Sequence, residues 1–409
     1  MNITLRLAWR NLWRHSHRTW LTVGAMIFSN VILVFMLSLQ FSMYSMMIDN
    51  TLAVSTGHLQ VQKPGYKDER KIRQSIPAAA ALGAAIRDNL AVDLVAVRAA
   101  AFALASSKER SFGIQVIGVQ PEYEPAVSTL PGLLSQGRYL DQAGPDAVVI
   151  GSVLARNLKV SVGDELTLLG SGRDGSFAAA IATVAGIIDS GMPDLDRSVA
   201  QMHLGTFQDV FSMGDEAHEI VIKTADISLV EDTRRRVEAL LPADANLTVL
   251  DWEALQPGLK QAIQADLVSA WFMYGLLIIL VAFSVLNTML MSVLERTREF
   301  GIIMALGLKP GQLGRLVMLE TALMGGMGLA LGVLLGGALI GWFGVHGFSY
   351  PGMAEMSERF NMPSSIYPQL SLMPLLLGPA IVYAATLIAS IYPALRLHWL
   401  QPVAAMRAA

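Results

Sequence analysis

The sequence predicts an α-helical membrane protein with four transmembrane helices and one large extracytoplasmic α+β domain. The chain is 53% hydrophobic and only 15% charged, whereas soluble domains carry about 25% charged residues. It contains four uncharged runs long enough to cross a hydrocarbon core of about 30 Å. Residues 44–267, between the first run and the second, have the composition of a soluble domain and suffice to bury a core of their own.

Four spans and the short segments around them account for the rest of the chain. The spans are predicted at residues 20–43, 268–294, 317–344 and 372–395. The flanking segments are residues 1–19, 295–316, 345–371 and 396–409. The first span has the basic flank of a signal peptide, but its apolar run is too long and no small-residue cleavage site follows closely. We therefore expect an uncleaved anchor.

Charge asymmetry predicts the orientation of the spans. Segments 1–19, 295–316 and 396–409 together hold ten basic and two acidic residues, whereas residues 43–267 hold 19 basic and 28 acidic ones. Because short loops rich in Lys and Arg stay on the cytoplasmic side, we expect both termini and the 295–316 link in the cytoplasm. The chain would then cross the membrane several times, with its large domain outside the cytoplasm.

The N-terminal segment predicts a cationic amphipathic helix. Its arginines are spaced four residues apart and form one stripe, made of Arg6, Arg10, Arg14 and Arg18. Tryptophan side chains supply apolar surface beside the stripe, and such helices lie in the headgroup layer of membrane lipid. Two interpretations stay open: the helix only anchors the topology, or it also braces the first span against a cytoplasmic partner.

The extracytoplasmic domain predicts a strand–helix–strand unit at each of its ends. The first has strands at 56–62 and 92–105 around a helix at 77–89, and the second has strands at 218–223 and 246–250 around a helix at 227–241. Two such units can share one split βαβ sheet of the ferredoxin-like, porter-like kind. Between them, residues 131–205 predict an inserted, mostly β lobe.

No motif in the chain indicates an enzyme. It has no phosphate-binding G-x-x-x-x-G-K-[ST] loop, no H-E-x-x-H and no nucleophile elbow. It has no cysteine, which excludes disulfides and Cys-ligated metals, and its seven histidines are scattered. Gly170–Gly175 matches G-x-G-x-x-G, but a strand-like stretch follows, so we expect a hairpin loop there. We expect no catalytic residue, no metal site, no cofactor bound by this chain and no nucleic acid partner.

The third span carries ridges of small residues. Gly328, Gly332 and Gly336 lie four residues apart, and Gly337 and Gly341 lie on a neighbouring ridge. Small ridges let helix backbones approach closely in lipid. The partner helix stays open: it can be the first span, the second span or a helix of another subunit.

Glu320 is the only acidic residue near the hydrocarbon. An unpaired charge at that depth costs several kcal/mol, so an ionisable residue in a span is a functional candidate. Two interpretations are open for Glu320: a structural ion pair with Arg315 or Arg298, or a role in coupling.

The link at residues 295–316 is too short to hold a domain. Glu295, Arg298 and Glu299 present charge, and Phe300, Ile302 and Ile303 are expected to present apolar surface. The stretch GLKPG at 307–311 breaks the helix before the third span. From its residues alone the link is equally well a docking helix or a solvated loop.

The link also carries a family pattern, E-x-x-R-E-[FIV]-G-[IV]-x-x-A-[LIV]-G followed by an acidic residue at the start of the third span. It is formed here by Glu295, Arg298, Glu299, Phe300, Gly301, Ile302, Ala305, Leu306, Gly307 and Glu320. With it, the chain resembles the FtsX-like (MacB/LolC/LolE-type) ABC transporter permease family. Leu7–Thr22, Gly137–Gly170 and Tyr392–Arg407 resemble that family's opening helix, periplasmic lobe and closing segment.

The resemblance implies a non-catalytic permease subunit. Two permeases, identical or paralogous, would sit on a separate ABC ATPase dimer that binds ATP and Mg. The ATPase would grip a coupling helix made of Glu295, Arg296, Arg298, Glu299, Phe300, Gly301, Ile302, Ala305 and Gly307. Closure of the ATPase dimer would then be transmitted through the spans as mechanical work outside the membrane.

The resemblance does not identify which process outside the membrane the protein drives. One hypothesis is release or export of a lipoprotein, hydrophobic or peptide cargo, with a possible periplasmic adaptor. The alternative is an ATPase-driven transmembrane lever that regulates an extracytoplasmic hydrolase. A signalling co-receptor for antimicrobial peptides is a weaker third hypothesis, because such members usually carry more spans. No residue of the outer domain indicates a substrate contact.

Overall fold

The computed structural model describes residues 3–14, 16–90, 94–140, 144–242, 245–349, 351, 353 and 365–399. The chain folds into two compact units. The helical unit takes in Met1–Tyr44, Ile263–Tyr350 and Ser365–Ala409, and the α/β unit takes in Ser45–Ala262. Residues 354–364 of the predicted loop at 345–371 and residues 400–409 of the predicted tail, with Arg407, lie outside the described residues.

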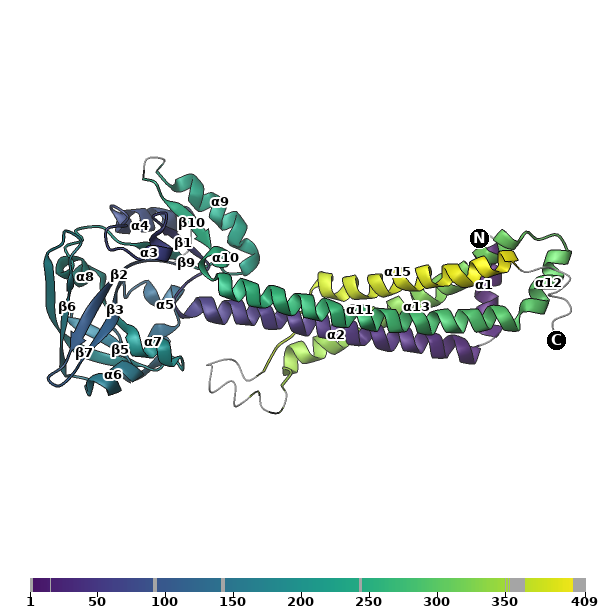
Figure 1. Cartoon of the computed structure of the whole chain (residues 1–409), viewed down its shortest axis with the longest axis horizontal. Coiled ribbons are helices and arrows are strands. Elements are labelled where there is room, and N and C mark those ends of the chain that lie inside the picture. Colours follow the sequence, from purple (N-terminus) through teal and green to yellow (C-terminus); the bar gives the residue numbers. More distant parts are fainter. Residues whose placement is uncertain are drawn as a thin grey trace. The chain divides into compact units, whose positions relative to one another are not determined.

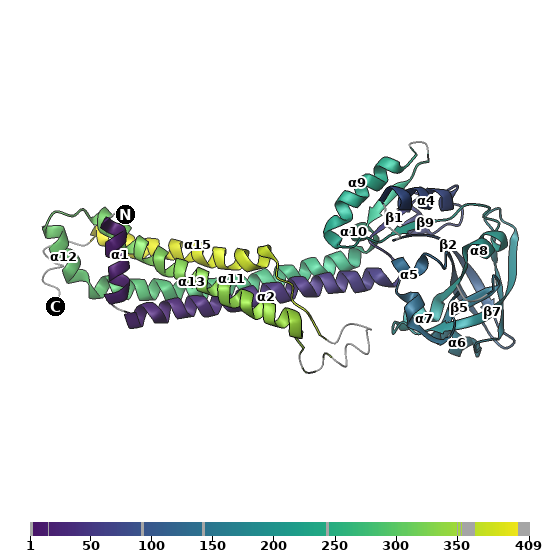
Figure 2. The same ribbon diagram turned by 180° about the vertical axis from the view of Figure 1, so that it is seen from behind.

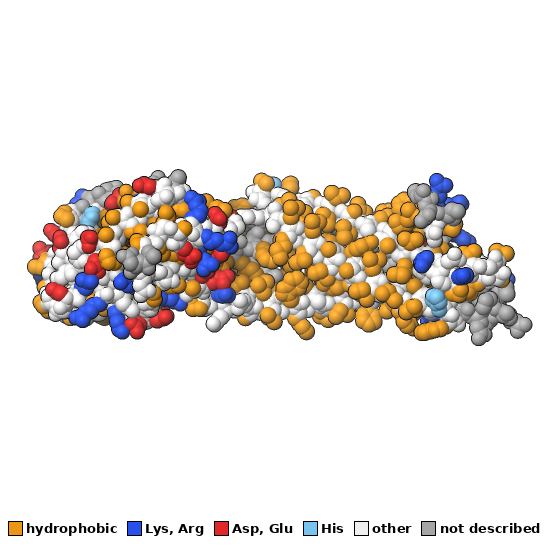
Figure 3. All heavy atoms as spheres, turned by 90° about the horizontal axis from the view of Figure 1, so that it is seen from above, with side chains coloured by type: hydrophobic (Ala, Val, Ile, Leu, Met, Phe, Trp, Pro, Cys, Tyr) orange, Lys and Arg blue, Asp and Glu red, His pale blue; other side chains and the backbone are white. Residues whose placement is uncertain are grey.

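Four long helices form the helical unit (Figure 1). They are α2 (Ser16–Val54), α11 (Pro257–Glu295), α13 (Pro310–His346) and α15 (Leu372–Arg396). Each is long and apolar enough to cross a membrane, and each contains one of the four predicted spans. All four contribute to one core, in which Val23, Val285, Met324 and Val382 are buried together. Figure 3 shows hydrophobic side chains spread along the visible face of these helices, as a lipid-facing surface requires.

The predicted glycine ridge of the third span packs against α2. A Cβ added at Gly332 would lie 2.5 Å from the Cβ of Asn30, and one at Gly328 would lie 2.7 Å from the Cβ of Met26. One turn further, Gly336 meets Val34 in the same way. The side-chain amide of Asn30 also donates to the Gly328 carbonyl at 3.2 Å. The partner that the sequence left open is therefore the first span.

The second predicted ridge makes no comparably close contact. A Cβ at Gly337 would lie 3.5 Å from Leu375 of α15, which is ordinary van der Waals distance, and one at Gly341 would meet no described atom within 4 Å. Gly341 is exposed on α13. Of the two predicted ridges, only Gly328–Gly336 therefore makes a close helix contact.

Two short helices lie at one end of the helical unit. They are α1 (Ile3–Arg14) and α12 (Thr297–Ala305), and α1 crosses the ends of the long helices in both views (Figures 1 and 2). Ala8 and Leu12 of α1 are buried, and Leu12 joins the helical core. Because α1 ends at Arg14 and α2 begins at Ser16, Arg18 belongs to α2. The prediction of one helical stripe from Arg6 to Arg18 is therefore wrong at its last member.

The strand–helix–strand units at the two ends of the α/β unit interleave in one sheet, in the order β10-β1-β9-β2. The elements are β1 (Leu59–Gln62), α4 (Ala79–Leu90), β2 (Val95–Ser106), β9 (Glu219–Ile222), α9 (Val230–Leu240) and β10 (Thr248–Asp251). Neighbouring strands are antiparallel. Leu59, Val97 and Ile220 point to the face that α4 and α9 cover, and they form the main core with Ile86 and Val237.

The middle of the domain closes into a ring. β2 continues past β9 and pairs with β3 on one side and β6 on the other, and the ring runs β2-β3-β8-β5-β7-β6. Its further strands are β3 (Ser111–Val119), β5 (Ala147–Gly151), β6 (Glu165–Ser171), β7 (Phe177–Ile188) and β8 (Val199–His203), and β4 (Leu134–Gly137) pairs with β7. Residues 131–205 therefore build their strands onto β2 and β3. The hairpin expected at Gly170–Gly175 joins β6 to β7.

Short helices complete the α/β unit. They are α3 (Tyr66–Glu69), α5 (Glu124–Val127), α6 (Ser152–Leu158), α7 (Pro193–Ser198), α8 (Leu204–Val210) and α10 (Trp252–Leu255). The segments around α3 and α10 border a cavity in this unit.

Candidate functional site

The link between the second and third spans forms the helix α12, bounded by a turn at each end. α11 ends at Glu295, and Arg296 occupies the N-cap position of α12. Gly307 follows α12 with a φ of +100°, a left-handed conformation that glycine adopts at little cost. Pro310 then begins α13, where a missing backbone N–H is no loss. The predicted break at 307–311 therefore separates α12 from the third span.

One face of α12 is buried in the helical unit. Phe300 is 0% exposed and lies in a cluster with Met304 of the same helix, Val293 of α11, and Leu313 and Val317 of α13. The expectation that Phe300 presents an apolar surface is wrong, because spacing by four places Phe300 and Met304 on the inward stripe. Gly301 is buried as well. Phe300 and Gly301 therefore hold α12 against the helical unit and do not face a partner.

The opposite face of α12 and the turn after it are exposed. We call this surface the link tip, and it comprises Arg298, Ile302, Ala305, Leu306, Gly307, Leu308 and Lys309. Leu306 is 80% exposed, and Ile302 and Leu308 are nearly half exposed. Three large apolar side chains next to two cations at a helix end form a surface that a protein partner could cover.

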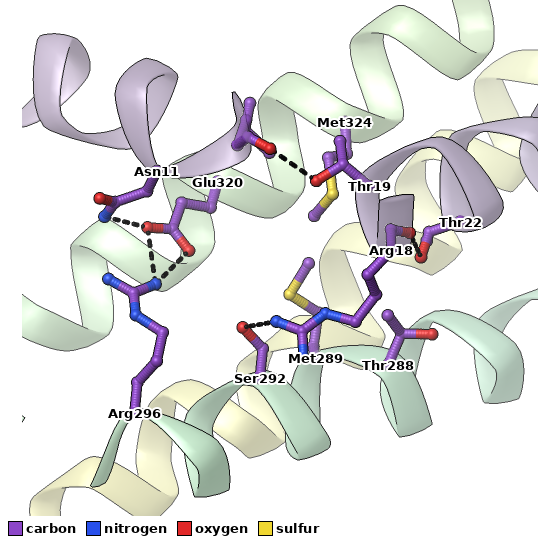
Figure 4. Close-up of a pocket in the computed structure, with 11 residues that line it drawn as sticks. Asn11, Arg18, Thr19, Thr22, Thr288, Met289, Ser292, Arg296, Glu320 and Met324 are labelled. Carbon is purple, nitrogen blue, oxygen red and sulfur yellow. Dashed lines mark hydrogen bonds and ion pairs between the residues drawn. The ribbon is translucent and has the colours of Figure 1, made fainter. Parts of the chain in front are cut away.

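Glu320 is buried and paired, but not with the predicted partners. Its carboxylate accepts from Nη1 of Arg296 at 3.2 Å and from the amide of Asn11 at 2.7 Å (Figure 4). Arg298 and Arg315 are both exposed, and neither has a described ion pair. The predicted pairing is therefore wrong. Arg296 pairs with Glu320 because the turn between α11 and α12 directs its side chain inward, whereas Arg298 and Arg315 lie on exposed faces.

The pair extends into a chain of charges that joins three helices and the turn between α11 and α12. Nε of Arg296 lies 3.4 Å from Glu299, and Glu299 in turn lies 3.1 Å from Nη2 of Arg14. We call Asn11, Arg14, Arg296, Glu299 and Glu320 the Glu320 network. It connects α1, the α11–α12 junction, α12 and α13. Arg296 and Glu320 are buried and Asn11 is half-buried. The Arg14 and Glu299 side chains are 63% and 41% exposed, so their pair contributes little to stability.

A second pair joins α2 to α11 beside this network. Arg18 forms an ion pair with Glu295. Its other terminal nitrogen donates to Ser292 at 2.7 Å (Figure 4). A cavity of about 20 Å³ lies between the two groups, lined in part by Arg18, Arg296 and Glu320. That is room for about one water molecule. The site is therefore a linkage of helices, too small to bind a substrate.

The remaining predicted surface cations lie apart from this linkage. Arg6 and Arg10 are exposed on α1, where Trp9 and Trp13 meet edge to face at 5.8 Å. Trp20 of α2 continues the row at 6.2 Å from Trp13. Exposed cations beside exposed indoles fit a membrane surface. Within the described residues, no group of His, Asp or Glu side chains is placed to hold a metal ion.

Sequence reasoning missed Asn11 and Ser292. Both are polar residues on otherwise apolar helix faces: Asn11 lies between buried Ala8 and Leu12, and Ser292 is followed by buried Val293. A polar side chain on an inward stripe is a signal for a buried partner. That signal was available in the sequence, but it does not identify the partner.

Comparison with known proteins supports the family pattern in both units. The FtsX-like permease C-terminal family model matches residues 271–402, and the MacB-like periplasmic core domain model matches residues 19–240, more than half of the chain.

Individual relatives are more distant. The lipoprotein-releasing system transmembrane protein LolC of Xylella fastidiosa (strain 9a5c) is 26% identical over 316 residues, which are 73% of this chain and 74% of that protein. LolC of Neisseria meningitidis serogroup B is 25% identical over 239 residues, and the chain spans only 56% of that relative's length. The periplasmic region of MacB from Actinobacillus actinomycetemcomitans aligns with 51% of this chain and 94% of that region, at 14% identity and a TM-score of 0.36.

Proposed function

Because this chain belongs to the FtsX-like permeases with a MacB-like periplasmic core domain, we propose that it couples ATP hydrolysis by a separate ABC ATPase to movement outside the membrane. The chain is an ABC transporter permease of the LolC and MacB type and a multi-pass inner-membrane protein. The ATPase binds ATP and Mg, and this chain supplies no catalytic group. Two permeases, either two copies or this chain and a paralogue, sit on one ATPase dimer.

The observation that carries the proposal is the two-sided construction of α12. Its outer side is the link tip, where Ile302, Leu306 and Leu308 are exposed. Its inner side is locked to α13 through Phe300, and the turn before it is locked through Arg296 and Glu320. A force on the tip is therefore transmitted to α13, because the buried contacts of Phe300, Arg296 and Glu320 make α12 and α13 move together. This supports the tip as the ATPase-docking surface and the Glu320 network as the transmitting element.

The helices that receive the force continue beyond the membrane-spanning length. α2 contains Arg18 near its first residue and ends at Val54, and α11 begins at Pro257 and ends at Glu295. Each has 39 residues, whereas a bilayer needs about 20. Displacement at Arg18 or Glu295 can thus travel along a continuous helix. The excess of Lys and Arg in the short segments supports a cytoplasmic position for both termini and the link.

The cargo is inferred from relatives alone. The two LolC relatives are named as transmembrane proteins of lipoprotein-releasing systems. We propose a lipoprotein, or another hydrophobic or peptide cargo, for this chain as well. The test is ATP turnover by the reconstituted permease–ATPase complex with an acylated lipoprotein and with the same protein lacking its acyl chains. Stimulation by an extracytoplasmic hydrolase in place of acylated protein would favour the lever alternative.

The docking surface is tested by replacing Leu306 and Leu308 with Asp and measuring how much ATPase co-purifies with the permease. We expect at least a tenfold loss of bound ATPase, with membrane insertion and thermal stability unchanged. Leu229→Asp is the matched control, because Leu229 is 48% exposed in the α/β unit and Leu308 is 44% exposed. Recovery of the intact complex with the double variant would refute docking at the link tip.

A further inference from the structure

The sheet face opposite α4 and α9 carries a row of polar side chains. Gln62 of β1 pairs directly with Glu219 of β9, and Glu219 pairs directly with Arg98 of β2. Residues in direct register point to the same face with Cβ atoms about 5 Å apart. Three neighbouring strands therefore present an amide, a carboxylate and a guanidinium side by side.

This row borders a cavity of about 280 Å³ within the α/β unit. The volume is just below the range for small-molecule sites, about 300–1,000 Å³. Lys67 of α3 and Arg70, which follows α3, also line the cavity. Thr56, just after α2, and Gln256, just before α11, lie at its edge and are hydrogen-bonded to each other at 3.2 Å.

Two groups in the row lack partners in the described structure. Gln62 is 1% exposed, yet neither its amide nitrogen nor its amide oxygen has a hydrogen bond there. Glu219 has no described hydrogen bond or ion pair, and burial raises the pKa of its carboxyl group against the attraction of Arg98 and Arg70. An unpaired buried amide such as that of Gln62 is costly and needs an explanation. Glu219 is half-buried, so its carboxylate stays open to a ligand.

Arg98, in contrast, already has hydrogen-bond partners within the protein. It forms a two-pronged pair with Glu124 of α5 at 2.7 and 3.0 Å, and it also donates to the Ser55 carbonyl. The groups left for a ligand are therefore Gln62, Glu219, Lys67 and Arg70. Lys67 donates to the Ala254 carbonyl and Arg70 to Gln115, but an ammonium has three donors and a guanidinium five. Both retain donors for a ligand.

We propose that this cavity binds a small zwitterion of the peptide type, an amino acid or a dipeptide. The ammonium group pairs with Glu219, the carboxylate pairs with Lys67 and Arg70, and the donor and acceptor of the Gln62 amide match a peptide group. A simple anion would meet the Glu219 carboxylate, and a simple cation would meet Lys67 and Arg70. A ligand with both charges satisfies every open group.

The test uses the full-length protein purified in detergent and L-alanyl-L-alanine as the probe, followed by calorimetry. We expect saturable binding in the millimolar range or tighter. N-acetyl-alanyl-alanine amide, which lacks both charges, should bind at least tenfold more weakly. Glu219→Gln should weaken binding of the free dipeptide at least tenfold. Absence of saturable binding, or equal binding of the capped and free dipeptides, would overturn the proposal.

A second variant guards against misfolding. Gln62→Met removes the unpaired amide, so we expect it to raise the thermal unfolding midpoint of the ligand-free protein while it abolishes dipeptide binding. Gln136→Met is the matched control, because Gln136 is exposed on β4, and it should change neither property. Undiminished dipeptide binding by a stabilised Gln62→Met protein would contradict the site.

Discussion

Arg296 and Glu320 form a buried ion pair in which Nη1 of the arginine lies 3.2 Å from each carboxylate oxygen. They are 24 residues apart in the sequence. Asn11 of α1 donates to the same carboxylate at 2.7 Å. One acidic side chain therefore joins the N-terminal helix, the third span and the turn that precedes α12.

Removing the Glu320 carboxylate should destabilise the helical unit strongly. Glu320→Ala leaves the Arg296 guanidinium buried without its main partner, and breaking a buried pair costs about 3–5 kcal/mol. Replacing both residues, as in Arg296→Met with Glu320→Leu, should restore part of the loss. Denaturant unfolding in detergent measures both effects. Arg315→Ala is the control, because exposed Arg315 should matter by less than about 0.5 kcal/mol.

The sequence did not predict that Arg296 is the partner of Glu320. Four spans could be predicted because an uncharged run is a local property of the chain. Arg298 and Arg315 were the predicted partners of Glu320, and Arg296 stands in the same link. Which of them faces inward depends on the turn at Arg296, and that turn is set by the burial of Phe300. No local pattern encodes that choice.

The same limit applies to packing between distant segments. The ridge Gly328–Gly336 was visible as a repeat of small residues, but its partners Met26 and Val34 look like ordinary lipid-facing positions in the sequence. Asn30, a polar residue in an apolar span, signals a buried contact without identifying its partner. In the α/β unit, β2 could be predicted as a strand. That it pairs with β9 at its start and β6 at its end depends on strands about 60–130 residues away.

Enlarging Gly332 should disrupt the contact between the first and third spans. A Cβ there lies 2.5 Å from the Cβ of Asn30, so Gly332→Leu forces the helices apart and removes the Asn30–Gly328 hydrogen bond. We expect a large drop in the thermal unfolding midpoint and in the yield of folded protein. Gly341→Leu is the matched control, since a Cβ at Gly341 meets no described atom within 4 Å. Equal behaviour of the two variants would contradict close packing at Gly332.

Substitutions of Phe300 and of Ile302 should have different effects, although the two residues lie close together on one helix. The first should reduce stability, and the second should reduce ATPase docking. Phe300→Ala opens a cavity in the cluster with Leu313 and Val317, at a cost of about 3–5 kcal/mol. Ile302→Ala removes an exposed side chain and should change stability by less than about 0.5 kcal/mol. Unfolding and ATPase co-purification, measured on both variants, distinguish the roles. A stable Phe300→Ala protein that has lost ATPase binding would place Phe300 on the docking surface after all.

His218 should make the α/β unit sensitive to acid. The ring is 0% exposed and stacks on Tyr66 at 4.8 Å. Nδ1 accepts from the backbone of Ala100 at 2.9 Å, and Nε2 lies 3.0 Å from the Ile72 carbonyl and donates to it. The neutral ring satisfies both contacts, and burial lowers the pKa of His218 to about 4.

The folded pKa of His218 is below the ordinary value of about 6.5, so the unfolded chain binds the proton more readily between these values. Stability from the neutral ring is complete above about pH 6.5 and decreases as the pH falls towards 4. Between about pH 7.5 and 5 the loss should be about 2 kcal/mol. Denaturant unfolding should show this loss in the wild-type protein and not in His218→Gln. His17→Gln, at an exposed position in the helical unit, should keep the wild-type pH dependence, and an unchanged dependence in His218→Gln would assign the acid sensitivity to another group.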